Sequence, residues 1–314
     1  MTKNRIGIDV GGTNVKLALV NDKGQIKYSN SVPTRAEMGY EYTFENIKQA
    51  IHDLLKETKL ETKDIEGIGF GFPGQVDYKA GIVRNAPNIP GWVEVPIAKL
   101  IEDEFHIPTR VDNDVRCAAL GELNYGAGKG CENLICITVG TGIGSGLIIN
   151  GKLVRGASNA AGEIGHIHIE DKEGDACGCG NHGCLEQYAS ATGISRLARK
   201  KMEHETRATI LTKEDLSAKA VFDAVKEGDE VANEIATEMG NYLGHAMADM
   251  AAVLDPAVFV IGGGVSKAGE VLLSFIEKPF MEKAFFANKN VKFKLATLGN
   301  DAGICGAAKL VLED

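Results

Sequence analysis

The sequence predicts an α/β protein built from two related domains, and three observations lead to this prediction. The chain has 314 residues, which is enough for two domains of ordinary size. Along most of the chain, short apolar segments typical of strands alternate with segments whose apolar residues have helical spacing. In addition, a glycine-rich hairpin occurs twice, at residues 5–20 and at residues 135–150. Such an internal repeat indicates two structural units of the same kind.

The two hairpins match in phase. When Ile6 is set on Ile135, Gly11 meets Gly140, and strand, turn and returning strand recur in the same order. The backbone N–H groups of such turns can bind an anion. One glycine-rich turn alone is weak evidence, and two could resemble each other by chance. Taken together, they predict two domains that face one nucleotide.

Asp9 lies shortly before the first of these turns, residues 11–14. A carboxylate there would repel a bare phosphate group. We therefore expect Mg²⁺, which prefers oxygen ligands, between Asp9 and the phosphate. A third glycine turn, residues 262–264, follows a buried strand and suits the adenine or ribose face of a nucleotide. A tight strand-to-helix turn is the alternative interpretation of these glycines.

The rest of the chain supplies the remaining helices and strands. Helices are predicted over residues 43–59, 96–105, 114–124, 185–203, 217–227 and 230–254, over a stretch that ends near residue 286, and from Ala302 onward. Strands are predicted over residues 65–72, 107–111 and 291–297, and a strand with its glycine turn over residues 257–265. Residues 85–92 are rich in turn residues and are predicted to form a loop.

Three polar residues, Asp112, Asn113 and Asp114, stand where a predicted strand ends and a helix begins. Asp and Asn are good N-caps, so a purely structural role is one interpretation. In α/β folds, however, ligands bind beyond the carboxyl ends of strands. The position therefore makes these residues candidates for a binding or catalytic site.

A cluster of cysteines and histidines in residues 162–186 predicts a metal site. Cys177, Cys179 and Cys184 lie close together, separated by glycines that allow the backbone to turn sharply. Three thiolates and one imidazole make a closed tetrahedral zinc site, which has no open position and is therefore structural. We choose His166 as the fourth ligand, with His168 as its rival. A loop of free thiols is the alternative.

Glu163 and Glu186 bracket this cluster. Zinc bound there would fix the loop so that Glu163, His166 and Glu186 face one pocket. Two carboxylates that accept hydrogen bonds and one imidazole N–H that donates suit a ligand rich in hydroxyl groups, such as a sugar. Ordinary surface charge is the alternative interpretation of the two glutamates.

Composition and charge restrict the possible partners. Apolar residues make up 44% of the chain and charged residues 25%, the profile of a soluble globular protein. A net charge of −9 argues against nucleic acid or an anionic membrane as the main partner. We expect no signal peptide, because a strand follows the first residues at once, and no apolar run could span a bilayer. The remaining cysteines, Cys117, Cys131, Cys136 and Cys305, fit free thiols in a reducing cytoplasm.

Five motifs together resemble the ROK sugar kinases. They are Asp9-x-Gly-Gly-Thr13, Asn113-Asp114, Glu163-Ile-Gly-His166, Cys177-x-Cys-Gly-x-x-Gly-Cys184-x-Glu186 and the glycines at 262–264. The match runs nearly from end to end, and its cysteine block is highly specific. The resemblance implies the actin/hexokinase-like fold, in which two ribonuclease-H-like α/β domains close over a cleft. It places residues 1–112 and 301–314 in a small domain and residues 113–300 in a large one.

The resemblance also implies phosphorylation of a hexose at its 6-hydroxyl by ATP, with Mg²⁺ and a structural Zn²⁺. Asp114 resembles the general base that takes the proton of the sugar hydroxyl. Besides Asp114, the expected sugar ligands are Gly74, Asn88, Asn113, Glu163, His166 and Glu186. The expected nucleotide ligands are Asp9, Gly11, Gly12, Thr13, Asn14, Thr138, Gly140, Thr141, Gly142, Gly262, Gly263 and Gly264. These roles agree with phosphoryl transfer, which depends mainly on positioning and charge stabilisation.

Glucose is the expected hexose, and N-acetylmannosamine, N-acetylglucosamine and fructose are its rivals. The same family contains sugar-responsive repressors, which carry a helix-turn-helix domain ahead of the sugar-binding body. The first predicted strand begins at residue 5, so we expect no such domain here. A non-catalytic sugar-binding protein is a further alternative, against which Asp9, Asp114 and the three glycine turns argue. Family analogy implies a homodimer or homotetramer.

Overall fold

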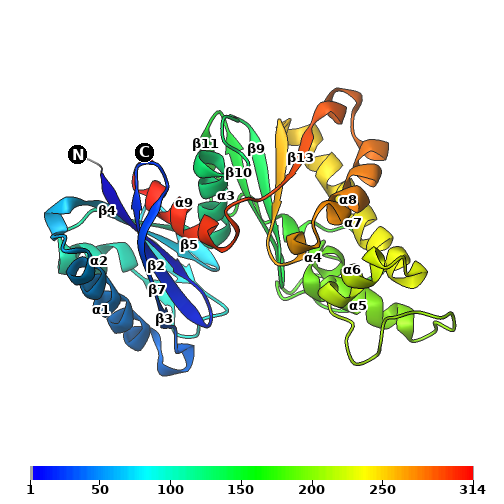
Figure 1. Ribbon diagram of the computed structural model, residues 1–314, viewed down its shortest axis with the longest axis horizontal. Coiled ribbons are helices and arrows are strands. Elements are labelled where there is room, and N and C mark those ends of the chain that lie inside the picture. Colours follow the sequence, from blue (N-terminus) through cyan, green and yellow to red (C-terminus); the bar gives the residue numbers. More distant parts are fainter. Residues whose placement is uncertain (1–2, 314) are drawn as a thin grey trace.

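Two five-stranded sheets divide the protein into two lobes (Figure 1). The structure, a computed structural model, describes residues 3–313. In the first lobe the strand order is β3-β2-β1-β4-β8. These strands are β1 (Asn4–Val10), β2 (Asn14–Asn21), β3 (Ile26–Pro33), β4 (Ile65–Phe72) and β8 (Thr109–Asn113). Strand β1 pairs antiparallel with β2 and parallel with β4.

The second sheet repeats the topology of the first, with the strand order β11-β10-β9-β12-β13. Its strands are β9 (Leu134–Val139), β10 (Ile143–Ile149), β11 (Lys152–Val154), β12 (Val258–Gly262) and β13 (Lys292–Leu295). Strand β9 pairs antiparallel with β10 and parallel with β12, as β1 does with β2 and β4. The internal repeat predicted from the sequence is therefore confirmed, because each glycine-rich hairpin begins a sheet of the same topology.

A third sheet, which the sequence does not predict, lies in the first lobe. It consists of β5 (Gln75–Asp77), β6 (Ile82–Asn85) and β7 (Val93–Val95). Strands this short carry too little alternation of apolar residues to be recognised. Trp92, at the end of the predicted loop, is fully buried, and its ring packs against those of Phe72 and Tyr40. The loop is thereby fixed to the core of the lobe.

Helices cover the sheets and enclose the two main apolar cores. The first lobe contains α1 (Tyr40–Thr58) and α2 (Ile97–Phe105). The second contains α4 (Glu186–Ala189), α5 (Ala191–Met202), α6 (Ala218–Lys226), α7 (Glu230–Leu254) and α8 (Glu270–Lys283). Helix α7 packs against α4, α5, α6 and α8, so it forms the centre of the core of the second lobe.

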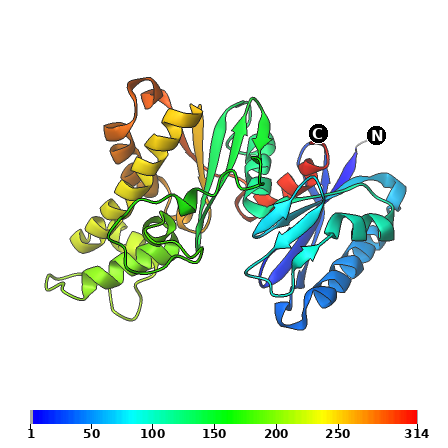
Figure 2. The ribbon, with the colours of Figure 1, turned by 180° about the vertical axis from the view of Figure 1, so that it is seen from behind.

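Two helices, α3 (Asp114–Tyr125) and α9 (Ala302–Leu310), lie between the lobes (Figures 1 and 2). Helix α9 packs on the first sheet at Gly7 and Gly69, where an added Cβ would lie 2.0 and 1.8 Å from helix carbonyl oxygens. Helix α3 packs on β10 at Gly146, where an added Cβ would lie 2.3 Å from Ala119. Each helix therefore lies directly on the backbone of one sheet.

The two helices also contact each other through glycines. At Gly121 of α3, an added Cβ would lie 2.3 Å from the carbonyl oxygen of Ala302. At Gly306 of α9, it would lie 1.6 Å from the carbonyl oxygen of Cys117. Real Cβ atoms do not approach oxygen this closely, so the packing of α3 on α9 requires glycine at both positions.

Several predicted elements differ in extent from those observed. The predicted helix over residues 185–203 is two helices, because the Ser190 hydroxyl accepts a hydrogen bond from the backbone N–H of Gly193 at 3.0 Å and caps α5. The helix predicted to reach residue 286 ends at Lys283, and the backbone then turns away. The domain boundaries near residues 112 and 300 stay predictions.

The helices and the cysteines can be compared with what composition and sequence led us to expect of membrane spans and disulfides. None of the helices within residues 3–313 is long and apolar enough to cross a membrane. None of the seven cysteines, all within residues 3–313, forms a disulfide, in agreement with the expectation for the four scattered ones.

Replacing Gly306 with alanine should destabilise the protein by about 3 kcal/mol, because the methyl group forces α3 away from α9. Gly174→Ala is the matched control, since no atom lies within 4 Å of its added Cβ. Urea unfolding of both variants measures the difference. Equal free energies of unfolding for the two variants would contradict the packing described here.

Candidate active site

The junction between β8 and α3 forms the first part of the site, and Asn113 caps the helix there. Its Oδ1 accepts hydrogen bonds from the backbone N–H groups of Val115 at 3.0 Å and Arg116 at 3.3 Å. Its Nδ2 donates to the carbonyl oxygen of Gly74 at 3.2 Å. The N-cap interpretation of Asn113 is therefore confirmed. These contacts also bring together three residues predicted to bind sugar, namely Gly74, Asn113 and Asp114.

Asp114 belongs to a group of three interacting carboxylates. Burial, together with the negative charges of Asp9 and Glu163, raises the pKa of Asp114 to about 6. Burial also raises the pKa of Asp9, and the charge of Lys16 opposes this shift. A carboxylate with a pKa near 6 is ionised at neutral pH yet basic enough to take a proton. The arrangement therefore fits the general base predicted at Asp114, a role that stays a prediction.

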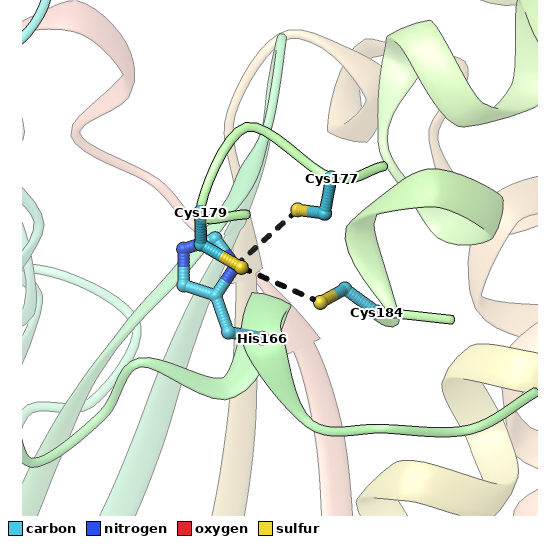
Figure 3. A group of neighbouring side chains, drawn as sticks. All are labelled: His166, Cys177, Cys179 and Cys184. Carbon is cyan, nitrogen blue, oxygen red and sulfur yellow. Dashed lines mark hydrogen bonds between the residues drawn. The ribbon is translucent and has the colours of Figure 1, made fainter. Parts of the chain in front are cut away.

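His166, Cys177, Cys179 and Cys184 converge at one point (Figure 3). Their ligand atoms all lie within 4.8 Å of one another. The Sγ atoms of Cys179 and Cys184 are 3.7 Å apart, and Sγ of Cys177 is 3.7 Å from Nδ1 of His166. The predicted Cys₃His set is thus brought together by the fold.

His168, the rival ligand, makes contacts elsewhere. Its Nδ1 lies 2.9 Å from the carbonyl oxygen of His182, and its Nε2 lies 2.8 Å from Oδ1 of Asp171. Both ring nitrogens therefore have partners away from the thiols, whereas His166 faces them. The geometry favours His166 as the fourth ligand, and metal binding itself stays a prediction.

Glu186 connects this cluster with the second glycine turn. Its Oε1 accepts a hydrogen bond from the Cys177 thiol at 3.0 Å and lies 3.8 Å from Nδ1 of His166. An added Cβ at Gly142 would lie 2.7 Å from its Oε2. These four residues line one cavity of about 790 Å³, together with Asn88 from the first lobe. Three of the predicted sugar ligands, Asn88, His166 and Glu186, therefore share a cavity.

The residues that brace the cysteine loop are not evident from the sequence. Arg196, on α5, forms an ion pair with Glu173, lies 3.0 Å from Asp175, and stands 5.4 Å from the centre of the Tyr188 ring. The hydrogen bond from Arg196 lowers the pKa of Glu173 to about 2. Arg196 also lines the 790 Å³ cavity. No local spacing indicates these pairs, because the partners lie about twenty residues apart in the chain.

A second brace that the sequence analysis misses lies beside Asp114. Asp112 is fully buried, and its carboxylate binds Arg116 at 3.1 Å and Arg155 at 2.6 Å. Asp112 was a candidate only through its place at the end of a strand, and neither arginine was one. The bond between Asp112 and Arg155 joins residues 43 positions apart, so the sequence contains no spacing signal for it.

Helix α5 holds the second glycine turn in place. The backbone N–H of Ala191 donates to the carbonyl oxygen of Gly140 at 2.8 Å. The hydroxyl of Thr192 donates to the carbonyl oxygen of Thr141 at 2.7 Å. Both contacts come from the first turn of α5, so the position of the glycine turn depends on that helix.

The second and third glycine turns meet at two adjoining cavities. Thr141 and Gly264 line a cavity of about 530 Å³, whose wall includes Phe222. Thr138 and residues 262–264 line the second, of about 350 Å³. Lys267 borders both. Predicted nucleotide ligands from two separate segments therefore line two cavities that share Gly264 and Lys267 in their walls.

The first glycine turn, residues 11–14, lies next to the loop that carries Asn88. The backbone N–H of Gly11 donates to the carbonyl oxygen of Asn14 at 3.0 Å. The hydroxyl of Thr34 donates to the carbonyl oxygen of Gly11 at 2.6 Å. The backbone N–H of Thr34 donates to the carbonyl oxygen of Thr13 at 2.9 Å. An added Cβ at Gly12 would lie 3.5 Å from the carbonyl oxygen of Asn88, which places this turn beside the Asn88 loop.

Comparison with known proteins decides the family. Residues 5–314 match the ROK family. The chain belongs to the ROK family. It is 40% identical to a glucokinase from Halalkalibacterium halodurans, over 98% of this chain and 94% of that protein. It is 36% identical to a glucokinase from Streptomyces coelicolor, over 98% of this chain and 97% of that protein.

A solved structure agrees with this assignment. The ROK protein is similar to a ROK family glucokinase from Streptomyces griseus in complex with glucose and AMPPNP, with a TM-score of 0.80 and 34% identity over 98% of both chains. The predicted actin/hexokinase-like fold is thereby confirmed, since its ROK sugar kinase neighbours have that fold. The roles of individual site residues stay predictions.

Replacing Asp114 with asparagine should stabilise the ligand-free ROK protein at pH 8 by about 3 kcal/mol. The folded state raises the pKa of Asp114 to about 6, so folding disfavours the ionised carboxylate. That cost is absent below about pH 4, grows between pH 4 and 6, and is complete above pH 6. Asparagine remains neutral throughout.

Urea unfolding of the wild type and Asp114→Asn at pH 4 and pH 8, without metal, measures this effect. Asp249→Asn is the control, because Asp249 is exposed on α7. If the free energies of unfolding of the wild type and Asp114→Asn differ by the same amount at both pH values, folding does not raise the pKa of Asp114.

Proposed function

We propose that this ROK protein is an ATP-dependent glucokinase that phosphorylates the 6-hydroxyl of glucose. Its glucokinase relatives and the similar structure that contains glucose and AMPPNP support the proposal. The observation that carries it is Asp114, a carboxylate whose pKa is raised to about 6 beside Asp9 and Glu163. A protein that only binds sugar has no need for such a base.

In this proposal, residues of both lobes bind the sugar. Asn88 comes from the first lobe, and Glu163, His166 and Glu186 come from the second. The Cys177 thiol donates to Glu186, but a thiolate has no proton to donate. Zinc held by this cluster would keep Cys177 ionised, and Glu186 Oε1 would then be free to accept a sugar hydroxyl. Hydrogen bonds of this kind allow strong discrimination between hexoses.

The chemical step is an in-line displacement. Asp114 accepts the proton of the 6-hydroxyl while the oxygen of that hydroxyl bonds to the γ-phosphorus of ATP. At the same time, the bond between the γ-phosphorus and the oxygen that bridges it to the β-phosphorus breaks. The products are glucose 6-phosphate and ADP. Asp114 then returns the proton to water, which a group with a pKa of about 6 does readily at neutral pH.

The nucleotide would occupy the region between the second and third glycine turns. The 530 Å³ cavity has Phe222 in its wall and suits the nucleoside, while the backbone N–H groups of the turns suit the phosphates. Asp9 is the residue that would hold Mg²⁺, which neutralises phosphate charge when bound.

The Cys₃His cluster fits a structural Zn²⁺. Zinc–sulfur bonds of about 2.3 Å place the sulfurs of a tetrahedral site about 3.8 Å apart. The separation of 3.7 Å between Cys179 and Cys184 already meets this requirement. Four ligands leave no open position, so the ion would order the loop and take no part in the chemistry.

The proposal extends to the setting of the enzyme. Free thiols and a zinc-thiolate cluster suit a reducing cytoplasm. A homodimer or homotetramer remains the expected assembly.

The wild type should phosphorylate glucose with a higher kcat/KM than N-acetylmannosamine, N-acetylglucosamine or fructose, and kcat/KM should rise as the pH rises through about 6. Asp114→Asn should lower kcat by about a thousandfold, because the base is lost. Glucose affinity, measured by calorimetry, should change little.

A coupled assay of ADP release over this hexose panel measures these rates, with Asp249→Asn as the control variant. Absence of phosphoryl transfer to every hexose would overturn the proposal. A near-normal kcat in Asp114→Asn would assign the base to another residue.

The wild type should contain one zinc ion per chain, and Cys179→Ala should lose it. Without metal the loop loosens, so glucose affinity should fall by about tenfold or more. ATP affinity should fall less, because the glycine turns lie elsewhere. Elemental analysis and calorimetry test this, with Cys131→Ala as the control, since Cys131 lies outside the cluster. Normal glucose binding by a zinc-free variant would refute the ordering role.

A further inference from the structure

We propose that Arg155 is a positioning residue, which holds the segment before Glu163 in a fixed position relative to Asp114. This inference rests on the function proposed above. It starts from Asp112, whose two oxygens bind different guanidinium groups. Oδ1 lies 3.1 Å from Nη1 of Arg116, and Oδ2 lies 2.6 Å from Nε of Arg155.

Asp112 also fixes the position of its neighbour in the site, Asn113. It is fully buried, and its Oδ1 also accepts the backbone N–H of Asn113 at 2.8 Å. Asn113 in turn caps α3, the helix that begins with Asp114. The orientation of the base therefore depends on a carboxylate two residues earlier in the chain, and that carboxylate depends on Arg155 and Arg116.

The two arginines also hold the segment of residues 156–163, which ends at Glu163. Arg155 directly precedes the segment. Arg116 crosses to its middle, where Nη2 donates to the carbonyl oxygens of Asn159 at 2.5 Å and Ala161 at 3.2 Å. Through Asp112, one ionic cluster thus fixes both the base and the sugar-binding segment.

Arg155 reaches a third part of the site as well. Its guanidinium stacks on the ring of Tyr78, with 3.6 Å between the guanidinium carbon and the ring centre. Tyr78 follows β5, the strand that begins immediately after Gly74. The segments that carry Gly74, Asp114 and Glu163 therefore all meet at one side chain, which is only 15% exposed.

One feature of Arg155 argues against a merely stabilising role. Its Nη2 is buried and has no hydrogen-bond partner among the residues that the structure describes. A buried donor without a partner is costly, so stability alone does not favour arginine here. The planar guanidinium, however, can bind Asp112 along one edge while its face stacks on Tyr78, and lysine cannot do both.

The consequence for catalysis follows from geometry. A shift of about 1 Å between reacting groups can lower a rate by about a hundredfold. We expect Arg155→Met to lower kcat by about a hundredfold and to raise the KM for glucose by about tenfold, because Asp114 and Glu163 lose their relative placement. The KM for ATP should change by less than about threefold, since the glycine turns do not contact this cluster.

Arg155→Lys keeps the charge and should recover part of kcat, though not the wild-type value. Arg207→Met is the matched control. Arg207 also binds two carboxylates, Glu205 and Glu234, each at 2.7 Å, and it lines none of the three cavities described above. Its kinetic constants should equal those of the wild type.

A double-mutant cycle separates positioning from general stability. If Arg155 acts through Glu163, then Arg155→Met should raise the glucose KM much less in a Glu163→Gln background than in the wild type. A purely structural loss would have the same effect in both backgrounds. Should Arg155→Met fail to fold, the Asp112→Asn, Arg155→Gln double variant serves instead, because it removes the positive and the negative charge together.

The outcomes distinguish the two proposals. A wild type that phosphorylates no hexose refutes the proposed function. An active wild type together with normal kinetics in Arg155→Met, or equal effects in both backgrounds of the cycle, overturns the inference about Arg155. A loss of kcat that is partly recovered by lysine and is non-additive with Glu163→Gln supports it.

Discussion

Contact between glycines and helix backbone determines how the two lobes meet. Helix α9 lies on the first sheet at Gly7 and Gly69, α3 lies on β10 at Gly146, and the two helices touch at Gly121 and Gly306. No side chain separates these surfaces, so the helices have little freedom to slide or rotate. This close packing fixes where each helix begins, and both helices begin at the site.

The starts of these two helices bring the carboxylates together. Helix α3 begins with Asp114, and an added Cβ at Gly303, in the first turn of α9, would lie 3.2 Å from Cγ of Asp9. A helix N-terminus stabilises a nearby carboxylate by about 0.3–1 kcal/mol. The raised pKa of Asp114 corresponds to a larger opposing effect of about 3 kcal/mol. Burial and repulsion therefore outweigh the effect of the helix, and the ionised carboxylate of Asp114 lowers the stability of the fold at neutral pH.

The sequence predicts those features that repeat or that depend on neighbouring residues. The two hairpins were recognised because their glycines recur in phase, and Asn113 because a cap acts on the next turn. The sequence already favoured His166 over His168, and the fold supports that choice, because His166 is the imidazole that faces the thiols. The three-stranded sheet was missed because its strands are too short. Arg155 was missed because its partners, Asp112 and Tyr78, lie far away in the chain.

The two sides of the site are built by different means, and this difference bears on specificity. On the nucleotide side, the turns offer backbone N–H groups, which every phosphate can accept. On the sugar side, long-range pairs such as Glu173 with Arg196 and Asp112 with Arg155 hold side chains in place. Groups that are ordered before the ligand arrives lose less entropy on binding. A hexose with one hydroxyl misplaced leaves such a fixed group unpaired, which costs more than an imperfect fit to a mobile loop. With the proposed roles, we therefore expect discrimination between hexoses to reside in the braced side chains of the second lobe, and the phosphates to bind at the glycine turns.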